Sequence, residues 1–311
     1  MRKRRWAVLA AFCAVASATP TAWASPATFV TALPVALDQI LARVNANTSF
    51  AAATLGYAQF PVSLALGVTS SLAIFTTLQQ GFSSLNLPAA SGASMQPTRA
   101  SSGERDVLAF ARYTLFKIDR PKTSLRIAPL AGAYLPTGSN TLADSQGLLP
   151  GPLQTGSGTV DPYVGITMGY NGTRYGSAWD ATYRWNPATA HGFTPGDEAR
   201  TDGEIEMRLL PVHLPDEGLP KELWIVLETN LIHDRRATVD GAVSPSSGGI
   251  TWNGAATLQL PTLHWELGAG VLLPIEQRFN GSGEIAEGKG FLSFFEYYLS
   301  APSWKRFRRP R

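Results

Sequence analysis

Charged residues are scarce in this sequence: they make up 16% of its 311 residues, whereas about a quarter is usual in soluble globular proteins. Cysteine is scarcer still, because Cys13 is the single cysteine and lies in the N-terminal apolar segment. Phe12 precedes it, where a lipoprotein cleavage site needs a small residue, so we do not expect a lipid anchor. Without Cys13 the chain has no thiol, which excludes disulfides and thiolate metal sites.

Long apolar runs are also missing, except at the N-terminus. Basic residues 2–5 precede an apolar run at 6–18, which is too short for a membrane helix and typical of a signal peptide. Ala22-Trp23-Ala24 then offers a small-x-small cleavage site. We therefore predict a signal peptide over 1–24, cleaved near Ala24. Cleavage after 16–18 and an uncleaved anchor are the alternatives.

The chain has little net charge away from its ends. Its formal charge is +3, but this becomes −1 without the four cations of the signal peptide and −6 without the five further cations of 301–311. Because the cations lie at the two ends, no basic patch predicts a nucleic-acid partner. We expect 25–300 to form one domain and 301–311 a basic periplasmic tail. That tail is either solvated or bound to a periplasmic partner or to lipid phosphates.

What the sequence does have is repeated two-residue alternation. In 175–185, Tyr175, Trp179 and Trp185 share one face, while Asp180 and Arg184 share the other. An apolar face with aromatics at both ends and charges opposite is typical of a strand that crosses a bilayer. Similar segments near 37–47, 55–66, 71–80, 107–115, 125–135, 161–170, 204–209, 223–231, 250–260, 263–273 and 291–299 bring the number of predicted strands to about 12.

The connections between these segments alternate in length, except that 48–54 is short and 213–220 is intermediate. Short connections are expected at 67–70, 119–123, 171–173 and 260–262, and long ones at 81–103, 137–157, 187–196, 234–248 and 276–288. Short turns on one side and long loops on the other are typical of outer-membrane barrels. We therefore predict an all-β, transmembrane, antiparallel up-and-down β-barrel of about 12 strands, of the outer-membrane type. A soluble β-sandwich is the alternative.

Several short motifs resemble a known family. They are Gly103-Glu104-Arg105-Asp106-Val107, Asp119-Arg120-Pro121, Leu135-Pro136-Thr137-Gly138-Ser139, Gly156-Ser157-Gly158 with Asp161-Pro162, Gly192-Phe193 with Gly196-Asp197-Glu198, and Ser247-Gly248-Gly249. In order and spacing, over about 28–299, they resemble the outer-membrane family named for the MetA pathway of phenol degradation. The resemblance implies an outer-membrane barrel described as a transporter and linked by name to aromatic catabolism. It carries over no catalytic residue. The chain departs from the pattern at its end, where the basic tail follows Leu299.

The inward faces of the predicted strands carry charges of both signs. The predicted lumen-lining residues are Arg112, Arg126, Asp161, Asp180, Arg184, Glu204, Glu206, Arg208, Glu228, Glu266 and Glu296. They either line a pathway and set its charge selectivity or pair into a network that plugs the barrel. Phe110, Leu130, Tyr134, Tyr163 and Trp224 make the interior partly apolar, which suits an apolar or aromatic solute, although such residues also simply fill space.

Catalytic and cofactor motifs are missing. The four histidines (His191, His213, His233 and His264) show no metal-binding spacing, and no nucleophile elbow or phosphate loop is present. We expect no cofactor and no enzyme; a barrel hydrolase using His191 or His264 is the least favoured alternative. The sequence thus predicts a channel or uptake barrel for small molecules in the outer membrane of a Gram-negative bacterium. Its expected partners are outer-membrane lipids and the barrel assembly machinery, and a plugged structural barrel is the second hypothesis.

Overall fold

The computed structural model describes 39–50, 55–85, 99–149, 151–187, 192–214, 221–262, 264–281 and 288–300. The predicted signal peptide, its cleavage site and the basic tail lie outside these residues. No helix in the described ranges is long and apolar enough to cross a membrane.

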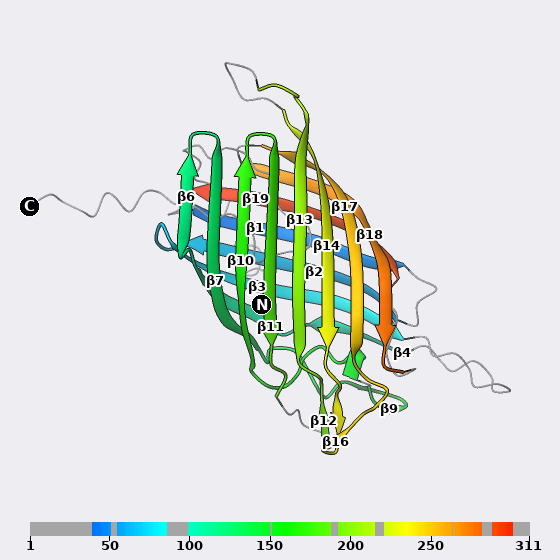
Figure 1. Cartoon of the computed structure of the whole chain (residues 1–311). Helices are drawn as coiled ribbons and strands as arrows, with labels where there is room; N and C mark the ends of the chain where they lie inside the picture. Colours follow the sequence, from blue (N-terminus) through cyan, green and yellow to red (C-terminus); the bar gives the residue numbers. More distant parts are fainter. Residues whose placement is uncertain are drawn as a thin grey trace, which may run out of the picture.

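Twelve antiparallel strands form a closed barrel (Figure 1). They are β1 (Gln39–Phe50), β2 (Leu55–Gly67), β3 (Leu72–Leu85), β5 (Val107–Tyr113), β7 (Thr123–Leu135), β10 (Asp161–Gly172), β11 (Tyr175–Arg184), β13 (Glu198–Leu210), β14 (Leu223–Asp234), β17 (Gly249–Pro261), β18 (Trp265–Phe279) and β19 (Lys289–Ser300). Each strand pairs with the next along the chain, β1 pairs with β19, and β7 pairs with β10 from Thr123 to Tyr134. The predicted fold class is confirmed.

Two short strands extend β5 at its ends. β4 (Arg99–Glu104) pairs with β3, and β6 (Phe116–Arg120) pairs with β7. β4, β5 and β6 therefore occupy one strand position of the barrel, with short interruptions between them. Gln39 of β1 is opposite Ser300 of β19, which places both ends of the barrel chain at the same rim. The long loops then lie at the opposite rim, which we call the mouth.

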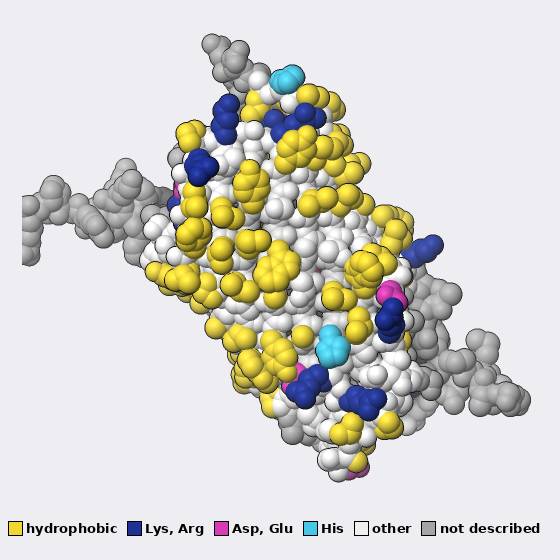
Figure 2. All heavy atoms as spheres, viewed as in Figure 1, with side chains coloured by type: hydrophobic (Ala, Val, Ile, Leu, Met, Phe, Trp, Pro, Cys, Tyr) yellow, Lys and Arg dark blue, Asp and Glu magenta, His cyan; other side chains and the backbone are white. Residues whose placement is uncertain are grey.

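The outer face of the wall is apolar, as the alternation predicted. In β11, Tyr175 is 55% exposed and Trp179 38% exposed on the outer face, whereas Asp180 on the inner face is 1% exposed. Figure 2 shows hydrophobic side chains spread across the middle of the visible face, with Lys and Arg toward its two ends. A band of apolar side chains with charges above and below it is the surface that a bilayer requires.

Two of the predicted long loops are shorter than expected, and the other three contain short elements of their own. β3 and β4 extend into the predicted loop 81–103, and β18 continues to Phe279 inside the predicted loop 276–288. Further short elements lie at the mouth: β8 (Ala143–Asp144) with β9 (Gly147–Leu148), the 3-10 turn η2 (Gly151–Leu153), and a sheet of β12 (Phe193–Thr194), β15 (Thr238–Val239) and β16 (Ala242–Val243). Their two-residue strands are too short to show a period in the sequence.

The inner face of β7 is closely packed against its two neighbouring strands. Gly132 lies opposite Phe110 of β5 and Tyr163 of β10, and a Cβ there would come within 2.1 Å of the Ala109 carbonyl oxygen and 2.5 Å of the Phe110 Cβ. Glycine therefore lets the two flanking aromatic rings approach across β7.

We expect Gly132→Ala to destabilise the barrel by about 1–3 kcal/mol, because the added methyl group overpacks a backbone contact. The measurement is urea unfolding of the lipid-reconstituted protein, followed by the heat-dependent shift of the folded band on gels. Gly169→Ala is the matched control, because a Cβ at this position in β10 meets nothing within 4 Å. Equal stability of the two variants would contradict the packing role of Gly132.

Candidate functional site

The barrel interior has an aromatic wall on β3, β5, β7 and β10. Phe75 and Phe110 stack with their ring centroids 4.6 Å apart, Phe110 is 6.1 Å from Tyr163, and Tyr163 is 5.7 Å from Tyr134. Arg112 lies over the Phe75 ring at 4.8 Å, at the other end of the series from Tyr134. The rings thus form an unbroken series of contacts along one side of the interior.

The other side of the interior is charged, and strand β13 carries more of these charges than any other strand. Glu198, Arg200, Asp202, Glu204, Glu206 and Arg208 alternate along its inner face. Arg200 pairs with Asp202 at 2.6 Å, and Arg208 reaches Glu222 at 3.7 Å. Two cations in the row are therefore bound by carboxylates near its ends.

The eleven predicted lumen residues fall into three groups. Buried on inner strand faces are Asp161, Asp180, Glu204, Glu206, Arg208, Glu228, Glu266 and Glu296. Arg112 and Arg184 are partly buried on the same side of the wall. Arg126 lies instead at the rim opposite the mouth, where its side chain is 43% exposed beside Asp119. Whether these residues line a pathway stays a prediction.

Several interior charges were missed by the sequence analysis. Arg43 on β1 is buried, donates a hydrogen bond to Asn45, lies 3.6 Å from Glu296 and covers the Phe294 ring at 3.9 Å. Asp202 was missed because the predicted strand began at 204. The alternation of charges from Glu198 onward could have revealed it, whereas one arginine in a weakly patterned segment gave no comparable signal for Arg43.

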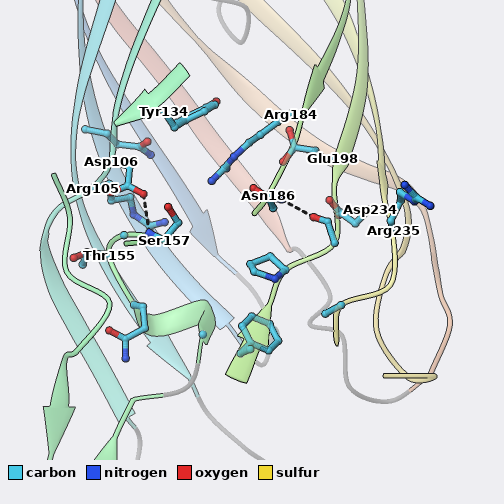
Figure 3. Close-up of a pocket in the computed structure, with 18 residues that line it drawn as sticks. Arg105, Asp106, Tyr134, Thr155, Ser157, Arg184, Asn186, Glu198, Asp234 and Arg235 are labelled. Carbon is cyan, nitrogen blue, oxygen red and sulfur yellow. Dashed lines mark hydrogen bonds between the residues drawn. The ribbon is translucent and has the colours of Figure 1, made fainter. Parts of the chain in front are cut away.

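A cavity of about 390 Å³ opens at the mouth (Figure 3). Its floor includes Tyr134 and Arg184, whose guanidinium lies 4.2 Å from the Tyr134 ring and 2.5 Å from Asp161. Loop residues form its sides, among them Gln154, Ser157, Phe193 and Gly196. The cavity therefore ends on the first ring of the aromatic wall.

Asp106 fastens one of these loops to the barrel. Its carboxylate accepts hydrogen bonds from the Gly138 N–H at 3.0 Å and the Ser157 N–H at 2.7 Å, so it holds both ends of the loop. The close approach needs glycine at 156, where a Cβ would lie 2.6 Å from Asp106 Oδ1. Leu149 and Leu153 are buried within the loop. These contacts fix the loop in place at the mouth. We call residues 137–157 the mouth loop.

A second carboxylate, Asp197, ties the next loop together. It accepts hydrogen bonds from the Asn186 N–H at 3.0 Å, the Tyr183 hydroxyl at 2.8 Å and Arg235 at 3.3 Å. Burial acts to raise the pKa of the Asp197 carboxyl, but these donors outweigh it, so that pKa lies below its ordinary value. The carboxylate form therefore holds this side of the mouth at neutral pH.

Histidines contribute little to these arrangements. His264 is exposed in the turn before β18 rather than in the strand, where its backbone N–H is bonded to Thr262. His191 lies outside the described residues. Within the described part of the chain, no group of three or more His, Asp or Glu is arranged to hold a metal ion.

Comparison with known proteins gives a fold and no family. No protein-family model matches the sequence, and neither does any curated protein. The fold is similar to the crystal structure of an outer membrane channel from Pseudomonas putida F1, with a TM-score of 0.58 and 14% identity over 89% of this chain and 100% of that chain. This chain therefore has the fold of an outer-membrane barrel. The resemblance to the MetA-pathway family stays a prediction.

Two other solved structures are less similar. The NanC porin has a TM-score of 0.44 and 10% identity over 84% of this chain and 100% of that chain. OprD from Pseudomonas aeruginosa has a TM-score of 0.32 and 11% identity over 84% of this chain and 91% of that chain. Scores this low carry no argument about this chain.

We expect Asp106→Asn to loosen the mouth loop, because an amide nitrogen cannot accept the hydrogen bond that one carboxylate oxygen accepts now. Leaving one buried N–H unsatisfied costs about 1–3 kcal/mol, so the Gly138 and Ser157 amides should exchange with deuterium faster. Mass spectrometry of peptides from 137–157 gives the rates. Asp119→Asn, at the opposite rim, is the control, and unchanged exchange in Asp106→Asn would contradict the fastening role.

Proposed function

We propose that the protein is an outer-membrane channel through which small, partly apolar or aromatic solutes cross passively. The observation that carries this proposal is the aromatic wall, which begins with Tyr134 in the floor of the mouth cavity and continues inward through Tyr163 and Phe110 to Phe75. A solute that enters the cavity meets ring faces and edges at once. Aromatic pairs favour such offset and edge-to-face contacts.

The barrel architecture supports the proposal from a second direction. The similar structure from Pseudomonas putida F1 is described as an outer membrane channel. The apolar outer band and the long loops at one rim suit insertion in an outer membrane with the mouth outside. Export through the predicted signal peptide agrees with this location. No proposed step needs a catalytic residue, so we propose a transport protein and no enzyme.

A plugged barrel is the second candidate, and one observation favours it. Phe75 is 1% exposed and Phe110 3% exposed, so the rings also fill the space they surround. Side chains can fill the interior of a small barrel completely. The two candidates differ in whether ions pass through the protein.

We expect single-channel currents when the mature chain, 25–311, is inserted into a planar lipid bilayer. Resorcinol, a small neutral aromatic probe, should interrupt the current, whereas glycerol at the same concentration should not. Phe110→Ala should weaken the resorcinol effect by about 2–10-fold, because an aromatic pair is worth about 0.5–1.5 kcal/mol beyond its buried area. The measured quantity is the dissociation constant from the interruption frequency and duration.

Phe60→Ala is the matched control, since this ring is 48% exposed on the outer face and should leave the resorcinol effect unchanged. A folded protein that passes no current would favour the plugged barrel. If resorcinol and glycerol affect the current equally, the preference for aromatic solutes is contradicted and the channel is still supported.

A further inference from the structure

The middle of strand β13 carries two carboxylates without a neutralising contact. Glu204 is 9% exposed and Glu206 5% exposed, and the buried Oε2 atom of each has no hydrogen-bond partner. Neither forms an ion pair with any residue in the described ranges. Because they are two residues apart on one strand, their side chains leave the same face about 7 Å apart.

The arginines of β13 and Arg43 of β1 lie against other groups. Arg200 is held by Asp202 at 2.6 Å, and Arg208 lies 3.7 Å from Glu222. Arg43 acts on Glu204 electrostatically, but its guanidinium lies against Glu296 and the Phe294 ring. None of these cations makes a direct contact with Glu204 or Glu206.

The surroundings add negative charge. Glu228 of β14 is directly opposite Glu204 in the strand register, and Glu206, Glu228 and Glu266 all repel the charge of Glu204. Carboxylates outnumber guanidiniums among the interior side chains of the described residues. The buried acids are Asp106, Asp161, Asp180, Asp202, Glu204, Glu206, Glu228, Glu266 and Glu296; the buried bases are Arg43 and Arg208, and the partly buried ones Arg112, Arg184 and Arg200. A passage with such walls concentrates cations and repels anions.

Phe75, the last ring of the aromatic wall, is on a strand across the barrel from these carboxylates. In the ring of twelve strands, β14 is the sixth neighbour of β3, so the strand of Glu228 faces the strand of Phe75. Figure 1 shows the same arrangement, with β13 and β14 in front of β2 and β3. Ring faces attract organic cations as carboxylates do, because the quadrupole of the ring places negative charge on its face.

We propose that Glu204 and Glu206 form a cation site in the lumen, and that the solutes this channel favours are organic ammonium ions with an apolar or aromatic body. The ammonium group binds between the two carboxylates, and the apolar body lies toward the rings of the opposite wall. This inference rests on the proposed function, because it names the solute class of the same pathway. It assigns the two carboxylates a role in selection rather than in support of the wall.

The first test is the reversal potential across a bilayer that separates two KCl concentrations. The unmodified protein should pass K⁺ in preference to Cl⁻, and the double variant Glu204→Gln with Glu206→Gln should lower that preference by about tenfold. Glu276→Gln is the matched control, because its carboxylate is exposed and paired with Arg278. The gel shift of the folded band checks each variant, and the single substitutions replace the double variant if that one does not fold.

The second test measures binding without current. Benzyltrimethylammonium is titrated into the detergent-folded protein in a calorimeter, with uncharged benzyl alcohol as the comparison. The ammonium ion should bind more tightly than the alcohol, and Glu204→Gln with Glu206→Gln should weaken its binding by about tenfold, whereas Glu276→Gln should not.

The two tests separate the two proposals. If no current passes, but benzyltrimethylammonium binds more tightly than benzyl alcohol and the double substitution weakens its binding, the channel is overturned and the cation site is supported. Currents without a preference for K⁺ over Cl⁻ would overturn the cation site and support the channel. The same conclusion would follow if the double variant kept both the K⁺ preference and the binding of benzyltrimethylammonium.

Discussion

The rest of the structure depends on the closure of the barrel, in which the first strand, β1, pairs with the last, β19. In a bilayer each backbone N–H and C=O needs a partner within the protein, and an open sheet would leave two edges without one. Closure leaves a wall one strand thick, in which neighbouring side chains point alternately to lipid and to the interior. Since the outer positions must be apolar, nearly all polar chemistry of the barrel is forced inside.

This constraint explains how aromatic and charged residues come to share one small interior. The rings of Phe110 and Tyr163 approach across β7 because Gly132 leaves space between them. Arg184 joins the two kinds of wall, because it binds Asp161 on β10 and also covers the Tyr134 ring. At the mouth, carboxylates bind mostly backbone and hydroxyl groups. Asp106 and Asp197 accept hydrogen bonds from N–H and O–H groups and so hold the loops in place.

The sequence was most informative where the period of two extends over many residues. It predicted the barrel, its twelve strands and the outward aromatics of β11, because lipid on one side makes that pattern strict. It was less informative where the outward side chains are not strongly apolar. β13 begins six residues before its predicted start, because Ala199, Thr201 and Gly203 on its outer face are small and give a weak alternation. The short strands at the mouth could not be predicted, because β12 pairs with β15 of a loop distant in sequence, and the hairpins β15–β16 and β8–β9 have strands of only two residues.

The pairing of charges distinguishes a passage from a filled core. A barrel that is only plugged gains most when each interior charge has a partner, because a buried charge without one is costly. Four interior arginines obey that rule: Arg43, Arg184, Arg200 and Arg208 each lie against a carboxylate. Glu204 and Glu206 do not, although ordinary substitutions such as glutamine would relieve the cost. Departures from local stability rules tend to occur at functional sites, and here the departure is two adjacent inward positions of one strand, where charge repulsion is offset when a cation binds between them.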